Sequence, residues 1–174
     1  MDLGLLVIRL AVGLTVAAHG CQKLFGWFGG GGPAGTASMF ESLGLRPGRP
    51  YALLAGLAEA AGGLLLALGF FTPLAVAAII GVMLVAFALV HRRKGFFLQG
   101  GGYEYNLVLA GASLGLAFTG PGAFSLDAVL GLTWGGAWAV AALIAGLLAG
   151  AAALLFARAV HRVDMPRETP HVPG

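Results

Sequence analysis

Four ionisable side chains stand inside, or at the ends of, long apolar segments of this 174-residue chain. They are Arg9, His19, Lys23 and Glu59. Charged groups at membrane depth are costly, generally face a bundle interior or a water-filled cavity, and mark functional sites by default. The chemistry open to them is hydrogen bonding to the head group of a ligand, or passage of a proton. We therefore expect a membrane protein with a polar centre.

Glu59 has the greatest need of a partner. Its neighbours from Leu57 to Gly62 are apolar or small, and the rise of an α-helix puts it roughly 12 Å inside its segment. A charge at the membrane centre costs ~2.5–3.5 kcal/mol on insertion scales. We predict a polar side chain from another segment within hydrogen-bond reach, and Arg9, entering from the opposite side, could extend towards it. The alternative is that an ion pair here only fixes helix register.

The other polar candidates stand near segment ends. Three ionisable residues of the first segment share a helical face that Gln22 borders, while His91 ends one segment and Glu104 opens another. We predict a polar ligand pocket in the cytoplasmic half of the bundle, with Glu59 at its floor. Its predicted members are Arg9, His19, Gln22, Glu59, His91, Glu104 and Asn106.

Each candidate also has a plainer interpretation. Lys23 and Arg9 can extend their side chains towards the membrane surface, and His91 can be a boundary residue before a basic run. The single cysteine, Cys21, excludes an internal disulfide and a dithiol motif. We expect Cys21 to be a packing residue, and the alternative is a thiol that meets a sulfur substrate or a partner protein. We assign no catalytic residue and no metal site.

Composition places the chain in the membrane. Hydrophobic residues make up 59% of it and charged residues only 10%, and there are 30 glycines. A soluble domain of this size would not carry so apolar a surface, whereas small residues suit close packing of membrane helices. The net charge is +3, but the basic residues cluster at segment ends rather than on one polar face. This distribution argues against nucleic-acid binding.

The predicted fold is an all-α, polytopic membrane helix bundle. Apolar segments of suitable length, separated by glycine and proline, indicate five spans. We expect a core over residues 1–127, a loop and a fifth span over 128–157, and a flexible cytoplasmic tail over 158–174. Two GxxxG pairs, at Gly111 and Gly146, fit close helix packing. The expected spans are residues 3–25, 51–70, 73–91, 104–118 and 137–156, with short surface helices near 36–43 and within 123–134.

Basic residues indicate the orientation. Lysine and arginine are enriched in cytoplasmic loops, and with five spans nine of them fall on one side and none on the other. We therefore expect the N-terminus outside and the C-terminus in the cytoplasm. The nine are Lys23, Arg46, Arg49, Arg92, Arg93, Lys94, Arg158, Arg162 and Arg167.

Several motifs, in their order and spacing over about residues 5–127, resemble the DoxX family of bacterial membrane proteins. The resemblance implies a four-helix core in the bacterial inner membrane, to which the fifth span is an addition. The motifs are Arg9-Leu10, His19 to Phe28, Gly35 to Ala37, Leu54 to Glu59, Gly62-Gly63, Val90-His91, Gly95 to Phe97, Gly101 to Asn106, Gly120 to Gly122 and Ser125 to Asp127.

For function, the resemblance implies a membrane subunit or anchor of an oxidoreductase or thiol-stress complex, close to a quinone. Such a protein would be an accessory subunit rather than a catalyst. It would have no covalently bound cofactor, quinone as the candidate cofactor, and soluble redox partners on the cytoplasmic face; homo-oligomers are an open alternative. A second hypothesis is a non-enzymatic binder of a lipid or amphipathic small molecule. A small transporter is less favoured, because no inverted repeat is evident.

Overall fold

The computed structural model describes residues 1–163, and every regular element in that range is helical. The predicted all-α bundle is therefore confirmed. Short 3-10 or π turns join several of the helices. The helices are α1 (Asp2–Phe25), α2 (Gly32–Ser42), α3 (Gly48–Leu68), α4 (Thr72–Ala86), α5 (Glu104–Thr119), α6 (Leu126–Val129) and α7 (Gly136–Val163).

Four helical segments are long and apolar enough to cross a membrane: Asp2–Phe25, Gly48–Leu68, Thr72–Lys94 and Gly136–Ala157. The third is α4 together with a π turn over Phe87–His91 and a 3-10 turn over Arg92–Lys94. The predicted fourth span corresponds to α5, which has 16 residues. At the α-helical rise this is about 24 Å, short of a ~30 Å hydrocarbon core. The crossing of the membrane by α5 stays a prediction.

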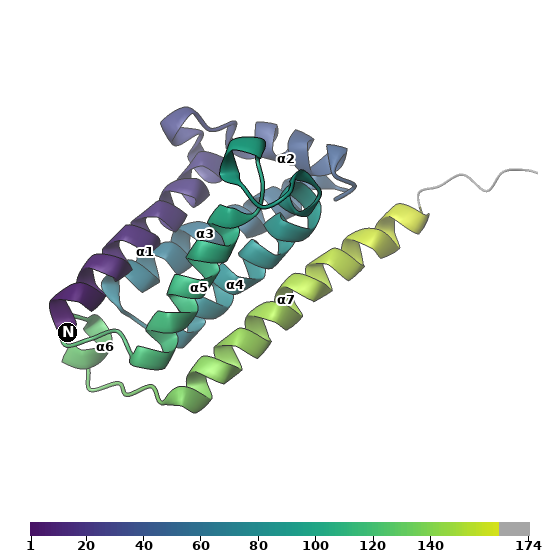
Figure 1. Cartoon of the computed structure of the whole chain (residues 1–174). Coiled ribbons are helices and arrows are strands. Elements are labelled where there is room, and N and C mark those ends of the chain that lie inside the picture. Colours follow the sequence, from purple (N-terminus) through teal and green to yellow (C-terminus); the bar gives the residue numbers. More distant parts are fainter. Residues whose placement is uncertain (164–174) are drawn as a thin grey trace, which may run out of the picture.

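The long helices alternate in direction along the bundle (Figure 1). The N-terminus, α6 and the start of α7 lie at one end. The other end holds α2, the loop between α4 and α5, and the last turns of α7. We call this second end the basic end, because it carries Arg46, Arg49 and the run Arg92–Lys94, all exposed. The structure thus gathers these residues at one end.

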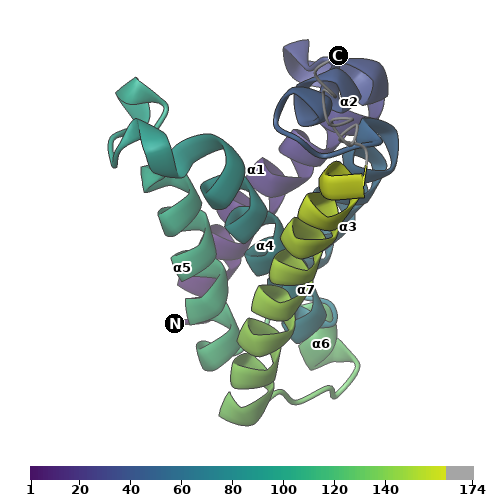
Figure 2. The same cartoon turned by 90° about the vertical axis from the view of Figure 1, so that its right-hand side faces the viewer.

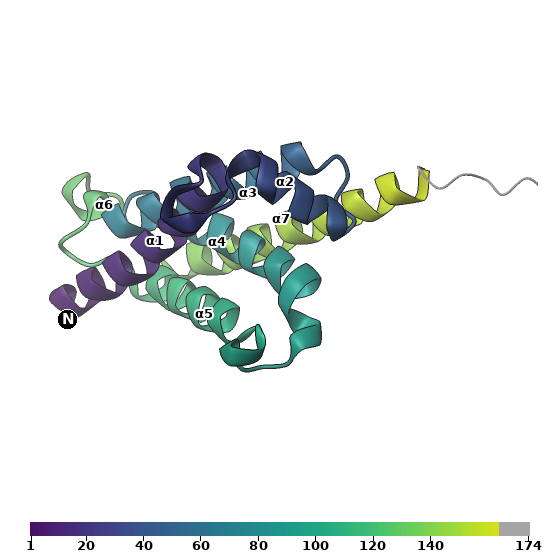
Figure 3. The ribbon, with the colours of Figure 1, turned by 90° about the horizontal axis from the view of Figure 1, so that it is seen from above.

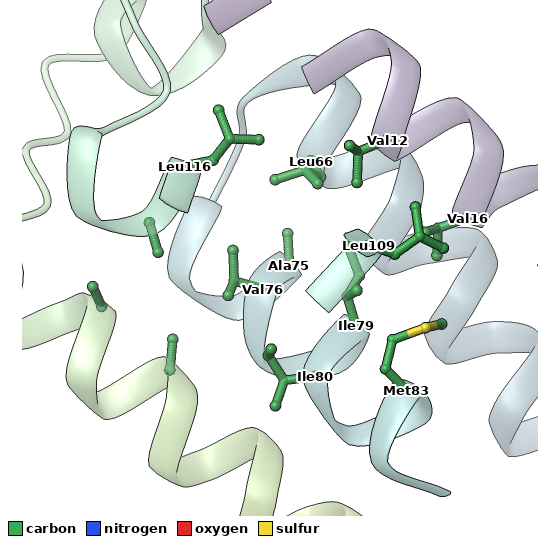
Figure 4. Close-up of a cluster of buried hydrophobic side chains, with 13 residues drawn as sticks. Val12, Val16, Leu66, Ala75, Val76, Ile79, Ile80, Met83, Leu109 and Leu116 are labelled. Carbon is green, nitrogen blue, oxygen red and sulfur yellow. The ribbon is translucent and has the colours of Figure 1, made fainter. Parts of the chain in front are cut away.

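Helix α4 is the central element. It packs against α3, α5 and α7, and from above it lies between α3 and α5 (Figure 3). Five helices contribute to the main buried cluster, including Val16 of α1, Leu66 of α3, Ile79 of α4 and Leu109 of α5 (Figure 4). Many outward side chains are large and apolar, as a surface in contact with lipid tails requires.

Helices α1 and α3 touch through their backbones. A Cβ atom placed on Gly13, Gly20 or Gly63 would lie closer than 3.0 Å to backbone atoms of the other helix. Small residues at such positions let membrane helices approach closely and gain van der Waals contact. The contacts set the register: Gly20 lies beside Ala60, and Gly13 lies beside Ala67.

The predicted glycine packing is confirmed on α7, whereas on α5 no neighbour packs against the glycines within the described residues. Gly146 and Gly150 lie against α4, where a Cβ on Gly150 would come within 2.8 Å of the Gly81 carbonyl oxygen. A Cβ on Gly111 or Gly115 would meet no atom within 4 Å in the described part of the chain. These two glycines stand on a helix face that nothing in residues 1–163 covers.

The C-terminal helix is longer than expected. Helix α7 continues to Val163, beyond the predicted end at residue 156. The first part of the predicted flexible tail, residues 158–163, is therefore helical. The rest of that prediction, residues 164–174, lies outside the described residues.

Candidate ligand site

An ion pair joins two helices inside the bundle. Lys23 Nζ of α1 donates to Glu59 Oε2 of α3, and the two side chains are 19% and 5% exposed. Because Gly20 lies beside Ala60, Lys23 is within one turn of the level of Glu59. A polar partner for Glu59 from another span, expected from its depth, is confirmed. The partner is Lys23, for which extension of the side chain towards the membrane surface was the plainer interpretation.

Arg9 does not reach Glu59, which corrects the approach expected from the sequence. Its side chain is 1% exposed and donates to three backbone carbonyls, those of Ala67, Pro121 and Phe124. The antiparallel register explains the difference: Arg9 is eleven residues before Gly20, or about 16 Å along the helix. It therefore ties the far end of α3 to the loop before α6.

A cavity of about 350 Å³ lies beside the ion pair, between α2, α3, α4 and α7. Along α4 its lining runs from Ala77 to His91, which at the α-helical rise is about 21 Å. Helix α7, which packs against α4 and runs along it in Figure 2, supplies one wall. Small side chains on α3, α4 and α7 leave space between the helices, and the alanines and glycines of the lining are Ala55, Ala58, Ala77, Ala78, Gly81, Ala86, Ala149, Gly150 and Ala153.

The polar lining of this cavity is sparse. Apart from Lys23 and Glu59 it comes from Tyr51, at the start of α3, and from His91 in the π turn after α4. The Tyr51 hydroxyl is buried and has no hydrogen-bond partner in the described part of the chain. His91 Nδ1 lies 2.6 Å from Gly101 O. A carbonyl only accepts, so Nδ1 holds the proton and Nε2 remains an acceptor in the neutral ring.

Two predicted site residues form a separate group on α1. His19 Nδ1 lies 3.1 Å from Gln22 Oε1, and Gln22 donates to Phe28 O. The His19 ring meets the Tyr105 ring edge-on, with centroids 5.9 Å apart. Neither His19 nor Gln22 lines the cavity, although the His19 carbonyl lies 3.5 Å from Lys23 Nζ.

The remaining predicted residues make local structural contacts. Glu104 accepts from Leu98 N at 3.0 Å and so orders the loop before α5. Asn106 is buried and donates to Met83 Sδ at 3.6 Å, across the contact between α5 and α4. Of the seven residues predicted to form the pocket, the structure brings Glu59 and His91 to one cavity. A ligand-binding role for each of the seven stays a prediction.

Residues 123–134 were expected to form a loop with a short surface helix; the short helix is present as α6, but its Asp127 is fully buried. Its carboxylate accepts from Phe71 N, Thr72 N, Thr72 Oγ1 and Trp134 Nε1, at 2.7–3.1 Å. It thus caps the N-terminus of α4, where the Thr72 hydroxyl also donates to it. Backbone donors at a helix start favour such a carboxylate, but no local sequence signal connects residues 72 and 127.

These features define a multi-pass helical membrane protein whose interior holds an ion pair beside an apolar cavity. The chain belongs to the DoxX family, whose model matches residues 4–92. That match contains all four polar residues of the cavity, whereas the α7 wall lies outside it.

Two inner membrane proteins of Escherichia coli (strain K12) are similar to this chain. Inner membrane protein YqjF is 32% identical over 133 residues, which cover 76% of this chain and 96% of that protein. Inner membrane protein YphA is 35% identical over 131 residues, which cover 71% of this chain and 87% of that protein. No solved structure matches.

Proposed function

We propose that this protein binds a single-chain amphipathic molecule inside the membrane. The observation that carries the proposal is the cavity of about 350 Å³, lined mainly by apolar residues and flanked by the Lys23–Glu59 pair. Ligand sites in proteins are commonly cavities of roughly 300–1,000 Å³ with apolar walls and a few polar groups. The ligand's chain would lie along α4 and its polar group beside the ion pair.

The elongated form of the cavity supports a chain rather than a compact ligand. Its lining follows α4 from Ala77 to His91, so a volume of about 350 Å³ extends along about 21 Å of helix.

The proposal includes a location and an orientation. We place the protein in the bacterial inner membrane, because the relatives in Escherichia coli are inner membrane proteins. The basic end faces the cytoplasm, following the preference of lysine and arginine for cytoplasmic loops. The cavity, which reaches His91 at that end, then opens in the cytoplasmic half of the membrane.

A quinone is the second candidate for the cavity. Lys23 supplies an N–H donor beside the cavity, and the carbonyl oxygens of a quinone only accept. In that case the protein would serve as a non-catalytic membrane subunit beside a redox enzyme. Analysis of what copurifies separates the two: a quinone with partner proteins supports the second candidate, and a lipid-like amphiphile alone supports the first.

The test places a large side chain in the cavity by substitution of one lining residue of α3. Ala58 lines the cavity, whereas Ala61, on the same helix, is exposed towards lipid. We expect Ala58→Phe to lower the amount of copurifying amphiphile per protein at least about tenfold, equivalent to 1.4 kcal/mol. The matched variant Ala61→Phe should retain it. Native mass spectrometry measures the amount of bound amphiphile per protein in each variant. Equal retention in the two variants would exclude the cavity as the binding site.

A further inference from the structure

The Lys23–Glu59 pair has unused hydrogen-bonding capacity. The Lys23 ammonium has three N–H donors, of which one is directed to Glu59 Oε2 and another to the His19 carbonyl at 3.5 Å. Within residues 1–163, Glu59 Oε1 receives no hydrogen bond. Both residues line the cavity. One donor and one acceptor are therefore free at the same place, next to an otherwise apolar wall.

From this arrangement we infer that the group recognised is a hydroxyl on an uncharged, single-chain amphiphile. A hydroxyl is both donor and acceptor, so it can donate to Glu59 Oε1 while accepting from Lys23 Nζ. The ligand class is that of long-chain alcohols and other neutral lipids with a free hydroxyl. This inference rests on the proposed function and names the chemistry of its ligand.

Charge balance disfavours ionic head groups. The charges of Lys23 and Glu59 compensate each other, and among the described residues His91 is the only other basic group in the cavity lining. A carboxylate or phosphate would meet Glu59, and a quaternary ammonium would meet Lys23 and has no proton to donate. Either one would also add an unpaired charge to a buried apolar site, which is strongly unfavourable.

Acceptor-only head groups satisfy half of the site. An ether oxygen or a quinone carbonyl can accept from Lys23 but leaves Glu59 Oε1 without a donor. Sites built to bond a hydroxyl discriminate strongly against analogues that lack it. We therefore expect the alcohol to bind at least about tenfold more tightly than the matching ether.

The experiment uses the full-length protein in lipid nanodiscs and measures binding of radiolabelled 1-dodecanol above the level of empty nanodiscs. Unlabelled 1-dodecanol, 1-methoxydodecane, dodecanoate and dodecyltrimethylammonium compete for the site. The expected order is the alcohol first, the ether about tenfold weaker or more, and the two ions weaker still. Equal competition by alcohol and ether, or tighter binding of dodecanoate, would overturn the inference.

Two variants test whether the Lys23–Glu59 pair is responsible for the preference for the alcohol over the ether. The double variant Lys23→Met/Glu59→Leu removes both charges together, a replacement that buried pairs generally tolerate. The double variant should bind the alcohol about as tightly as it binds the ether, and so lose the preference for the alcohol. Arg92→Met, at an exposed position outside the cavity lining, should keep the preference.

The same assay separates this inference from the proposed function. If alcohol and ether bind equally and Ala58→Phe abolishes both, the cavity binds amphiphiles and the hydroxyl inference is wrong. If Ala58→Phe and Ala61→Phe both bind all probes like the unmodified protein, the cavity proposal itself fails. The comparison of alcohol with ether needs no variant, so a folding defect in the double variant does not remove the test.

Discussion

At the residue scale, two of the buried charges, Arg9 and Glu59, are stabilised in different ways. Arg9 directs its planar guanidinium to the Ala67, Pro121 and Phe124 carbonyls, a geometry that suits its fixed fork of donors. Glu59 pairs with Lys23 and keeps one oxygen free. Arg9 is thus engaged by protein atoms and lies away from the cavity, whereas the Lys23–Glu59 pair can bond a ligand.

The role of Arg9 can be tested on stability alone. Arg9→Met leaves carbonyl groups without donors, and each unsatisfied buried group costs about 1–3 kcal/mol. We expect a clear fall in the thermal unfolding midpoint of the purified protein, with Arg9→Lys intermediate because one ammonium cannot reach all three carbonyls. Amphiphile binding by the folded fraction should be unchanged.

The matched control is Arg92→Met, at an exposed position of the basic end. Surface substitutions of this kind generally change stability by less than about 0.5 kcal/mol. If Arg9→Met and Arg92→Met unfold at the same temperature, the carbonyl contacts of Arg9 do not stabilise the bundle.

At the element scale, small residues determine both the close contacts and the cavity. Gly13, Gly20 and Gly63 bring α1 and α3 into backbone contact, and this contact sets the level at which Lys23 meets Glu59. Where small residues of α3, α4 and α7 face one another without such contact, the space between the helices becomes the cavity. Small residues thus allow close contact between α1 and α3 but leave a cavity between α3, α4 and α7.

Alanine substitution distinguishes the two environments of glycine. In Gly63→Ala the new Cβ would lie 2.5 Å from the Gly13 carbonyl oxygen, so the α1–α3 backbones must separate. Overpacking of this kind costs roughly 1–3 kcal/mol, and the shift should also weaken amphiphile binding by displacing Lys23 from Glu59. Unfolding of the purified protein measures the first effect and probe binding the second.

Gly111→Ala is the control on α5, because its Cβ would meet no described atom within 4 Å. Replacing a helical glycine with alanine there should leave stability unchanged or raise it by about 0.5–1 kcal/mol. A loss of stability in Gly111→Ala comparable to that in Gly63→Ala would mean that α5 has a close neighbour outside the chain.

At the scale of the whole molecule, charge is distributed unevenly between the two ends. Arg46, Arg49 and Arg92–Lys94 are exposed at the basic end, beside α2 and the α4–α5 loop (Figure 1). The opposite end carries Asp2, which accepts from Ala123 N, and the buried Asp127. This asymmetry is the physical basis for the proposed orientation.

Reporter fusions test the orientation and the crossing by α5 together. With a reporter enzyme that is active only outside the cytoplasm, a fusion after Lys94 should be silent and a fusion after Gly131 should be active. Activity after Lys94 and silence after Gly131 would show that the orientation is opposite to the proposed one. Equal signals at the two sites would mean that the 16 residues of α5 do not cross the membrane.

The sequence alone determined the properties that depend on local composition. Apolar stretches of membrane length predict the helices, and basic residues at their ends predict which ends lie together. The depth of Glu59 within an apolar segment requires a partner, because an isolated charge there is costly. Each of these inferences needs only the neighbours of a residue along the chain, and the family membership agrees with motifs of the same local kind.

Only the tertiary structure decided which groups meet. The choice of Lys23 rather than Arg9 as the partner of Glu59 follows from the register of α1 against α3, which glycine contacts set. The burial of Asp127 depends on residues about 55 positions away, and the cavity requires α2, α3, α4 and α7 together. Helical periodicity fixes the face of a residue but not the height at which two helices pack, so contacts between helices cannot be derived from one segment at a time.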